Sequence, residues 1–278
     1  MERKAPRKPA HEPRPASPHN RRGNGVSASH NGGQRFYGVH AAAAAWLNPA
    51  RECLRLSVSE SGFEAMEATL DAAKKSGLRR PQPELRDRAD LDRMVPAGSV
   101  HQGIVLEVKP LEELGLEDIL VQADSAEGGV CLVILDQVTD PHNVGAVLRS
   151  ASAFGAAAVL VTERHAPEVT GVLAKSASGA LETTPIVRVG NLARALDDLR
   201  DAGFWTIGLA EEGAQTLAQL DLTGRVALAM GAEGPGLRRL TRERCDALAR
   251  LPTQGPIGSL NVSNAAAVAL YEVARRRG

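Results

Sequence analysis

The segment VCLVILDQVTDPHNVGAVLRSASAFGAAAVLVT, residues 130–162, decides the fold class of this 278-residue chain. Residues 130–135 form an apolar run typical of a buried strand, and residues 157–162 form a second one. Between them, residues 143–154 carry apolar side chains at the spacing of a helix. A strand, a helix and a second strand within about 30 residues form the repeating unit of a parallel sheet. The segment therefore predicts an α/β fold.

The same alternation continues to the end of the chain. Further strands are expected at residues 185–189, 204–209, 226–230 and 247–251, and further helices at residues 169–177, 191–202, 237–245 and 261–275. Strands this rich in Val, Leu, Ile and Ala, joined by helices, indicate a mainly parallel sheet covered on both faces. We therefore expect residues 130–278 to form one domain, with ligands bound at the carboxyl ends of its strands.

Residues 36–110 predict a second, smaller α/β domain. Helices are expected at residues 38–47, 60–75 and 86–94, and strands at residues 52–58 and 103–108. Asn48-Pro49 ends the first helix, and Gly77 ends the second. Residues 111–129 mix acidic and apolar side chains, and we interpret them as a linker to the larger domain.

The first 35 residues have the composition of a disordered basic tail. They contain 8 Lys or Arg against 2 Asp or Glu and almost no apolar side chain, so they bury too little surface to offset the entropy of ordering. The whole chain carries 33 residues of each sign, which leaves the rest of it net acidic. A mobile basic arm attracts phosphate backbones, and a tail without a specific role is the alternative. An organellar transit peptide is disfavoured, because the five prolines oppose an amphipathic helix.

Several classes of protein are disfavoured by what the sequence lacks. Cys53, Cys131 and Cys245 are odd in number and far apart, so they predict neither a disulfide framework nor a zinc motif. A reducing, cytoplasmic setting is therefore expected. No apolar run reaches the roughly 18 to 20 residues of a membrane span, so no membrane contact is expected. The sequence has no P-loop, no nucleophile elbow and no metal-ligand spacing, and we expect no metal cofactor.

Three strand exits carry polar loops from which a site can be built. They are residues 136–143 (DQVTDPHN), residues 231–236 (GAEGPG) and residues 252–264 (PTQGPIGSLNVSN). Purely structural explanations exist for the first two loops. Asn143 stands where a helix N-cap is expected, and Glu233 precedes a helix N-terminus, where a carboxylate is favoured. Arg149 lies off the apolar face of its helix and is explained equally well as a solvated charge.

The third loop has more polar groups than a helix cap can use. Ser259, Asn261, Ser263 and Asn264 are four cap-competent residues within six positions, whereas a helix has a single N-cap. The glycines of this loop allow the backbone to approach a ligand closely. Glycine-rich loops with Asn, Arg, Glu and Ser, without a metal or a nucleophile, suit direct transfer between two bound substrates. A transferase is therefore favoured over a hydrolase.

At these loops the sequence resembles the SpoU family of the SPOUT superclass, whose members are S-adenosylmethionine-dependent RNA ribose 2′-O-methyltransferases. The resemblance is carried by NVGAVLR (143–149), MGAEGPG (230–236) and SLNVS (259–263). These motifs occur in the expected order at the ends of predicted elements, and the resemblance covers residues 130–277. It implies an α/β sheet whose carboxy-terminal segment forms a trefoil knot, a rare exception to the rule that chains avoid knots.

The resemblance also implies roles for individual residues. The catalytic set is Asn143, Arg149, Glu233, Ser259 and Asn261, and the cofactor contacts are Gly231, Leu251 and Leu260. In the family the residue matching Arg149 is a proposed general base. A guanidinium is a poor base at neutral pH, so we expect Arg149 to hold the target phosphate or the developing alkoxide, with the other four catalytic residues orienting Arg149 and the ribose. The family's Ile-Pro-Met is here LPT (251–253), which leaves the contribution of Thr253 unassigned.

The smaller domain indicates the RNA target. FYGVHA (36–41), Asn48-Pro49 and HQGI (101–104) are similar to the substrate-binding domain of the branch that methylates a guanosine in the peptidyl-transferase loop of 23S ribosomal RNA, an L7Ae-like domain. Packing within a small domain is the alternative explanation for Tyr37 and His101. Family members act as dimers, so a homodimer is expected, and the apolar helix at residues 261–275 is compatible with one.

Three alternatives stay open on the sequence alone. In the first, the substrate is transfer RNA. In the second, it is another ribosomal loop whose methylation confers antibiotic resistance. In the third, the chain is a catalytically silent RNA-binding or ribosome-assembly protein. The intact catalytic set argues against the silent protein. An aromatic content of 3% disfavours a protein that binds single strands by base stacking. We expect RNA to contact the tail, the small domain and patches such as residues 238–239 and 275–277.

Overall fold

The larger unit of the protein is built around a parallel sheet. The computed structural model describes residues 33–255 and 258–277. In this part of the chain, the strands of the large sheet are β5 (Cys131–Asp136), β6 (Ala158–Thr162), β7 (Ile186–Val189), β8 (Trp205–Leu209), β9 (Gln215–Thr216), β10 (Val226–Gly231) and β11 (Ala247–Arg250). They lie in the order β7-β6-β5-β10-β8-β11-β9, and all neighbours are parallel. The expected α/β class with a mainly parallel sheet is confirmed.

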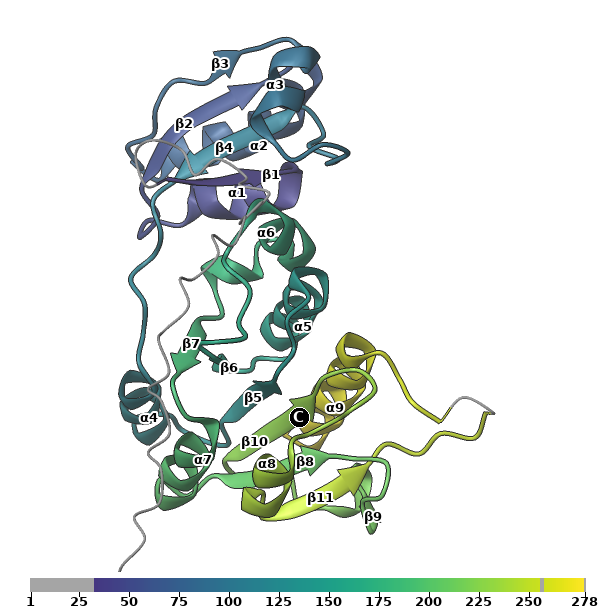
Figure 1. Ribbon diagram of the computed structural model, residues 1–278. Helices are drawn as coiled ribbons and strands as arrows, with labels where there is room; N and C mark the ends of the chain where they lie inside the picture. Colours follow the sequence, from purple (N-terminus) through teal and green to yellow (C-terminus); the bar gives the residue numbers. More distant parts are fainter. Residues whose placement is uncertain (1–32, 256–257, 278) are drawn as a thin grey trace, which may run out of the picture.

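Helices cover both faces of this sheet (Figure 1). They are α4 (Leu116–Asp124), α5 (Pro141–Ala153), α6 (Gly171–Ala177), α7 (Leu192–Asp201), α8 (Arg239–Arg244) and α9 (Val262–Arg277), with short 3-10 turns at Ala180–Glu182 and Leu217–Gln219. Val133 and Leu135 of β5 pack into the core with α5, α6 and α9. Leu132 and Ile134 point to the opposite face and pack with α4 and α7. Burial on both faces is why this strand is apolar from Cys131 to Leu135.

The smaller unit has a four-stranded sheet of its own. Its elements are β1 (Gln34–Tyr37), α1 (Val39–Leu47), β2 (Cys53–Val58), α2 (Glu60–Lys75), β3 (Glu84–Leu85), α3 (Arg88–Met94) and β4 (Ile104–Val108). The strand order is β1-β4-β2-β3, with β4 antiparallel to both β1 and β2. Phe36, Trp46, Leu56 and Met66 are buried together in its core. This core is large enough for a separate packed unit.

The two units meet at α6, which lies between the small sheet and α5 (Figure 1). Gly171 begins α6, and a Cβ there would lie only 2.5 Å from both the carbonyl oxygen of Arg35 and the ring of Tyr37. The contact therefore requires glycine at this position. Beside it, Arg51 and Glu182 form a buried ion pair of 2.8 Å, and Asn48 Nδ2 donates to the same carboxylate at 2.7 Å.

Two of the boundaries expected from the sequence are wrong. The supposed linker, residues 111–129, contains α4, whose residues Leu116, Ile119 and Ala123 pack into the core of the large sheet. These three apolar side chains have helical spacing, but the acidic residues between and around them made the pattern too weak to predict a helix from the sequence. The supposed tail, residues 1–35, lies outside the described residues up to residue 32, but Gln34 and Arg35 already belong to β1. They are ordered because β1 pairs with β4, a partner far along the chain.

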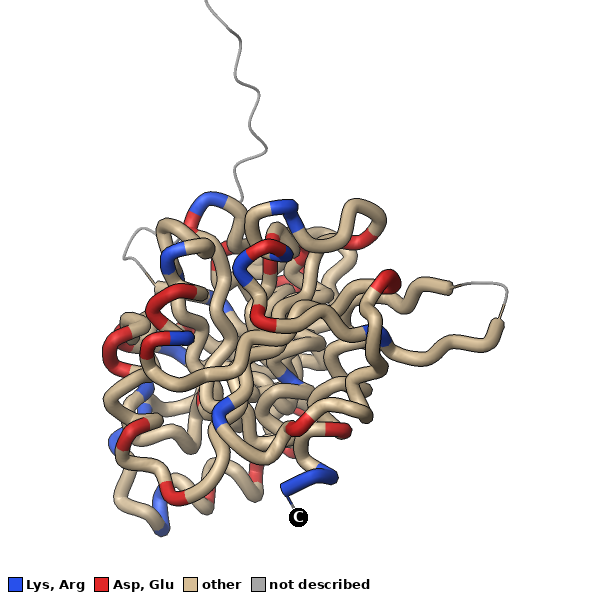
Figure 2. The backbone as a smooth tube through the Cα atoms, turned by 90° about the horizontal axis from the view of Figure 1, so that it is seen from below, with Lys and Arg blue, Asp and Glu red and all other residues tan. Residues whose placement is uncertain are grey.

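Charged residues of both signs are spread along the described backbone (Figure 2). Among the described residues, no helix combines the length and the apolar character that crossing a membrane requires. The same part of the chain contains no group of three or more His, Cys, Asp or Glu residues placed to hold a metal ion.

Candidate active site

The three polar loops that the sequence singled out converge at the carboxyl edge of the large sheet. The first follows β5, the second follows β10, and β5 and β10 are adjacent in the sheet. The third follows β11 and leads into α9, which packs against α5. These loops are far apart in sequence, but adjacent strands and the contact between α5 and α9 place them together.

Asn143, Glu233 and Asn261, one from each loop, form a hydrogen-bonded cluster. Asn143 Nδ2 donates to Glu233 Oε1 at 3.1 Å, and Asn261 Nδ2 donates to Asn143 Oδ1 at 3.0 Å. Asn261 Nδ2 also donates to Glu233 Oε1. Glu233 Oε2 makes no hydrogen bond with another described residue. The cluster therefore holds a carboxylate in place and leaves one of its oxygens available.

Asn143 and Asn261 both lie near the start of a helix, but only Asn261 caps its helix. Asp140 is the N-cap of α5, because its side chain accepts from His142 N at 3.0 Å. The expectation that Asn143 caps this helix is therefore wrong, since α5 begins two residues earlier, at Pro141, which is favourable in the first turn. Asn261 does cap α9: its carbonyl accepts from Ala265 N, and its Oδ1 accepts from Ser263 N at 2.9 Å. The side-chain amide of Asn261 remains free to reach Glu233.

The loop after β10 is anchored by a buried carboxylate. Asp136, at the end of β5, is fully buried and accepts from Arg238 N, Arg238 Nε and Thr241 Oγ1 at 3.0, 2.6 and 2.6 Å. Gly231 packs so closely against the same loop that a Cβ would lie 2.0 Å from the carbonyl carbon of Gly236. The loop folds back on itself through a bridge between Ala232 and Gly236. Its backbone is thus fixed before any ligand arrives.

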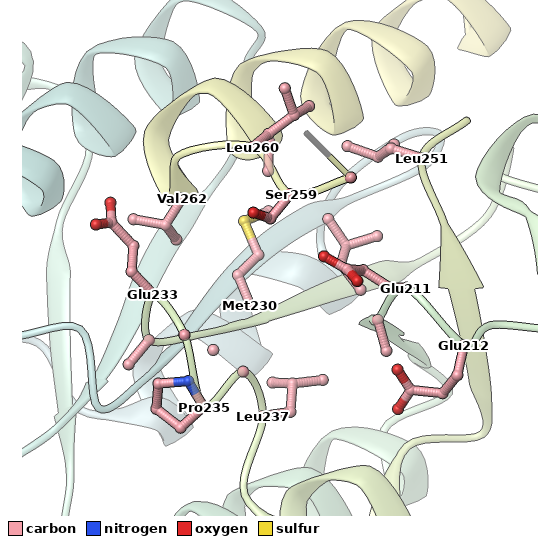
Figure 3. Close-up of a pocket in the computed structure, with 18 of the residues that line it drawn as sticks. Glu211, Glu212, Met230, Glu233, Pro235, Leu237, Leu251, Ser259, Leu260 and Val262 are labelled. Carbon is pink, nitrogen blue, oxygen red and sulfur yellow. The ribbon is translucent and has the colours of Figure 1, made fainter. Parts of the chain in front are cut away.

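A cavity of about 340 Å³ lies against this loop (Figure 3). Its volume falls within the range of roughly 300 to 1,000 Å³ that small-molecule sites occupy. Apolar side chains from three strand ends and from the starts of α8 and α9 form much of its wall, namely Leu209, Met230, Leu237, Leu251, Leu260 and Val262. Carboxylates also line it, with Glu233 on one side of Met230 and Glu211 on the other in Figure 3. The cavity can therefore hold a molecule that is partly flat and apolar and partly cationic.

The structure brings together most of the residues that the sequence predicted. Gly231, Leu251 and Leu260, the expected cofactor contacts, line the cavity, and so do Glu233 and Ser259. Asn143 and Asn261 do not line the cavity. They form hydrogen bonds to Glu233, which does line it.

Arg149 is the exception within the predicted catalytic set. It is exposed on α5, does not line the cavity, and makes no hydrogen bond or ion pair with another described residue. The expectation that the other four catalytic residues orient Arg149 is thus not met by contacts within this chain. Its guanidinium thus has no partner within residues 33–255 and 258–277.

Sequence reasoning missed Glu211, Glu212 and Arg242, which also line the cavity. Glu211 and Glu212 follow β8 after one intervening residue, Ala210, and Arg242 pairs with Glu212. The rule that ligands bind at the carboxyl ends of strands would have selected both carboxylates. Thr253, whose contribution was unassigned, lines the cavity as well, and its hydroxyl donates to the carbonyl of Gly258 at 3.1 Å.

The cysteines lie away from this cavity and are poor nucleophiles. Burial raises the pKa of Cys131 to about 12 and that of Cys245 to about 12. Burial likewise raises the pKa of Cys53 to about 11. Because the thiolate is the reactive form, these thiols are protonated and inert near neutral pH.

Two family models match this sequence. Residues 131–271 match the SpoU rRNA Methylase family, and residues 36–114 match a model described as RNA 2'-O ribose methyltransferase substrate binding. The first covers the sheet and all three loops, and the second covers the small unit.

Curated relatives match over most of their length. The 23S rRNA (guanosine-2'-O-)-methyltransferase RlmB of Pseudomonas aeruginosa is 44% identical, over 88% of this chain and 97% of the relative. The protein of the same name from Ralstonia nicotianae is 43% identical, over 86% of this chain and 94% of the relative. Among solved structures, the SpoU methyltransferase AviRb from Streptomyces viridochromogenes, in complex with the cofactor AdoMet, superposes with a TM-score of 0.69 at 26% identity. That alignment covers 88% of this chain and 90% of AviRb.

Proposed function

This chain belongs to the SpoU rRNA methylase family, and we propose that it transfers a methyl group from S-adenosylmethionine to the ribose 2′-hydroxyl of a guanosine in 23S ribosomal RNA. The curated relatives carry this activity in their names and match both units of the chain. A guanosine of the peptidyl-transferase loop is the proposed target. Such a substrate places the enzyme in the cytoplasm.

The observation that carries the proposal is the cluster of Asn143, Glu233 and Asn261 beside the 340 Å³ cavity. Transfer of a methyl group from a bound donor needs the donor and the acceptor oxygen in one place with fixed orientation. The cavity offers a pocket for the donor, and the cluster offers polar groups for a sugar next to it.

The cavity wall fits S-adenosylmethionine, which supplies an electrophilic methyl group on its sulfonium. Leu209, Leu251 and Leu260 present apolar surface suited to the adenine ring. Glu211 and Glu233 present carboxylates that suit the positive charges of the donor. Gly231 holds the loop that forms the floor of the pocket in a shape that a side chain would disrupt. AviRb, a structural relative at 26% identity, carries the same cofactor.

Glu233 is placed to act on the ribose hydroxyl. The bound cofactor would supply the methyl group to the ribose oxygen, and the proton of that hydroxyl would pass to the carboxylate of Glu233. Glu233 Oε1 is occupied by two amide donors, and the unpaired Oε2 accepts the hydrogen bond of the hydroxyl. Ser259, which lines the cavity without a hydrogen-bond partner among the described residues, adds a hydroxyl that orients the sugar. Asn143 and Asn261 hold Glu233 in position.

Arg149 binds the phosphate or the developing alkoxide of the substrate. Its lack of an ion pair within the described chain supports this role, since nothing competes for its donors. A guanidinium can donate two parallel hydrogen bonds to an anionic oxygen pair. Its distance from the cavity lining means that the substrate or a second copy of the chain completes the site.

We also propose that the protein is a homodimer that uses the surface of α9. Val268 and Tyr271 are 47% and 54% exposed on this helix, and Tyr271 packs edge to face on Phe154 of the α5 C-terminus. Large apolar side chains grouped on a helix favour an interface. Light scattering checks this: a mass of one chain at working concentration contradicts it.

The test of the activity is methylation in vitro of separate RNAs. The purified chain is incubated with labelled S-adenosylmethionine and with 23S rRNA, 16S rRNA or transfer RNA, and the modified ribose is then mapped. We expect label in one guanosine of 23S rRNA. A transcript with 2′-deoxyguanosine at the mapped position is the matched control and accepts no label, because it lacks the acceptor oxygen.

The other outcomes discriminate the alternatives. Label in transfer RNA, or at another ribosomal nucleotide, overturns the proposed substrate while keeping the reaction class. No label in any RNA, with no calorimetric binding of S-adenosylmethionine, indicates a silent RNA-binding protein with the same fold.

A further inference from the structure

A second cavity, of about 540 Å³, lies beside the candidate active site. It is found at the carboxyl ends of β6 and β7, where Thr162, Arg164 and Gly190 line it. Its other wall is formed by Arg238 and Arg239 at the start of α8. The methyl-transfer chemistry described above uses none of these residues.

This cavity is basic. Arg164, Arg238 and Arg239 contribute three guanidinium groups. None of the described residues that line it is an Asp or a Glu. Three carboxylates flank it. Glu163 Oε2 lies 3.7 Å from the position that a Cβ would take on Gly190, Asp136 accepts from Arg238, and Glu243 pairs with Arg239 at 2.7 Å. Among these three arginines, Arg164 is the one without a carboxylate partner in the described part of the chain, and its free guanidinium suits an anionic ligand.

Two of the arginines differ in a way that suits anion binding. Arg238 is held by the buried Asp136, to which its Nε donates at 2.6 Å, so its guanidinium loses little freedom when a ligand arrives. Arg164 is exposed and makes no hydrogen bond or ion pair with another described residue. One guanidinium is therefore fixed in place, and another has all its donors available.

The basic cavity and the active-site cavity share one loop. Gly231 to Leu237 line the active-site cavity, and the next residues, Arg238 to Thr241, line the basic one. Asp136 anchors the loop at the junction between them. A nucleic acid strand has regularly spaced phosphates. When one of its riboses lies at the active-site cavity, the neighbouring phosphates lie close to that cavity. The second cavity is therefore within reach of the same strand.

We propose that the basic cavity binds a phosphodiester group of the RNA strand that carries the target ribose, with Arg164 and Arg238 as the donors. This inference rests on the proposed function and adds to it a contact that sets the register of the substrate without reading its sequence. It assigns Arg164 to RNA affinity and leaves the methyl donor untouched.

The test compares Arg164→Gln and Arg164→Lys with the wild-type chain. Affinity for the shortest 23S rRNA transcript that the wild type methylates is measured over a series of salt concentrations. Loss of one phosphate contact lowers the slope of log K against log salt by about 0.7 to 0.9. We expect this reduction and a raised KM for RNA in Arg164→Gln. Arg164→Lys retains most of the slope because it retains the charge. Calorimetric affinity for S-adenosylmethionine and kcat at saturating RNA stay at the wild-type values.

Arg200→Gln is the matched control, since Arg200 lies at the opposite end of α7 and pairs with Asp197. An equal loss of slope in this control assigns the effect to overall charge and overturns the site. A wild-type slope and a wild-type KM in Arg164→Gln also overturn the site. In that case methylation of the transcript by the wild-type chain still supports the proposed function. A wild-type chain that methylates no transcript overturns both.

Discussion

At the scale of single residues, the candidate site depends on amide groups that bind one another before they meet a substrate. Asn143 and Asn261 both donate to Glu233 Oε1, and Asn261 also donates to Asn143. A carboxylate held by two neutral donors loses its freedom of rotation. This prior ordering reduces the reorganisation that the reaction itself requires.

Arg149→Ala is expected to reduce methyl transfer without weakening cofactor binding. The guanidinium is free within the described chain and outside the cavity lining, so its partner is the RNA and not the methyl donor. Loss of one donor to a developing negative charge typically lowers kcat by about 10²- to 10³-fold. Single-turnover methylation and calorimetry with S-adenosylmethionine measure the two effects separately, and Arg149→Lys tests the need for the planar group. Weakened cofactor binding with an unchanged chemical step contradicts the assignment.

Gly231→Ala is expected to weaken binding of S-adenosylmethionine at least tenfold. The new Cβ would lie 2.0 Å from the carbonyl carbon of Gly236 and 2.2 Å from Leu237 N, and both are backbone atoms that cannot rotate away. The loop must therefore shift and deform the cavity that it lines. Gly224→Ala is the control, because a Cβ there meets nothing within 4 Å. Wild-type cofactor affinity in Gly231→Ala would show that the loop does not shape the pocket.

At the scale of elements, the start of α9 joins helix stability to the chemistry of the site. Asn261 ends the loop, caps the helix through its carbonyl and Oδ1, and donates to Glu233 through Nδ2. One side chain thus serves the fold with its oxygen and the site with its nitrogen. The two roles are separable because they use different atoms of the amide.

Asn261→Asp is expected to preserve stability and to lose activity. Aspartate accepts from the helix N–H as asparagine does, but it cannot donate to Glu233 and places a second negative charge beside it. Asn261→Ala loses both functions and lowers the free energy of unfolding by about 0.5 to 2 kcal/mol. Urea denaturation and methylation assays on both variants separate the effects. Ser259→Ala, which removes no hydrogen bond between described residues, is the stability control. Equal activity in the aspartate variant and the wild type would remove Asn261 from the site.

At the scale of the whole molecule, the two units are joined by a buried ion pair. Arg51 Nε and Nη2 donate to the Glu182 carboxylate at 3.1 and 2.8 Å, and both side chains are less than 5% exposed. The connecting segment after β4 runs along the molecule to α4 at the far side of the large sheet (Figure 1). The ion pair and the packing of α6 on the small unit, and not the connection, therefore hold the two units together.

Glu182→Ala is expected to destabilise the protein by about 3 to 5 kcal/mol, because it leaves the buried guanidinium of Arg51 without its counter-charge. The double variant Arg51→Met with Glu182→Leu is expected to recover most of this loss, since apolar side chains of similar size leave no buried charge. Guanidinium chloride denaturation measures both. A loss below about 1 kcal/mol in Glu182→Ala means that water reaches the interface.

Much of the fold could be predicted because it depends on local pattern. The apolar run of β5 and the helical spacing of α5 are properties of neighbouring residues, and the structure places these elements within two residues of the prediction. The failures have a common cause. Gln34 joins a strand because β4 lies beside it, and Leu116 is buried because the sheet provides a face for α4. Neither partner is visible in the local sequence.

The sequence by itself determined which segments form strands and helices, and which polar residues stand at their ends, since spacing and capping chemistry act over a few positions. Only the tertiary structure decided that Asn143 serves Glu233 and not its helix, that Arg149 stays free, and that Glu211 faces the same cavity as Ser259. Asn143 and Asn261 are 118 residues apart. Their contact depends on the packing of every element between them, and no local pattern encodes it.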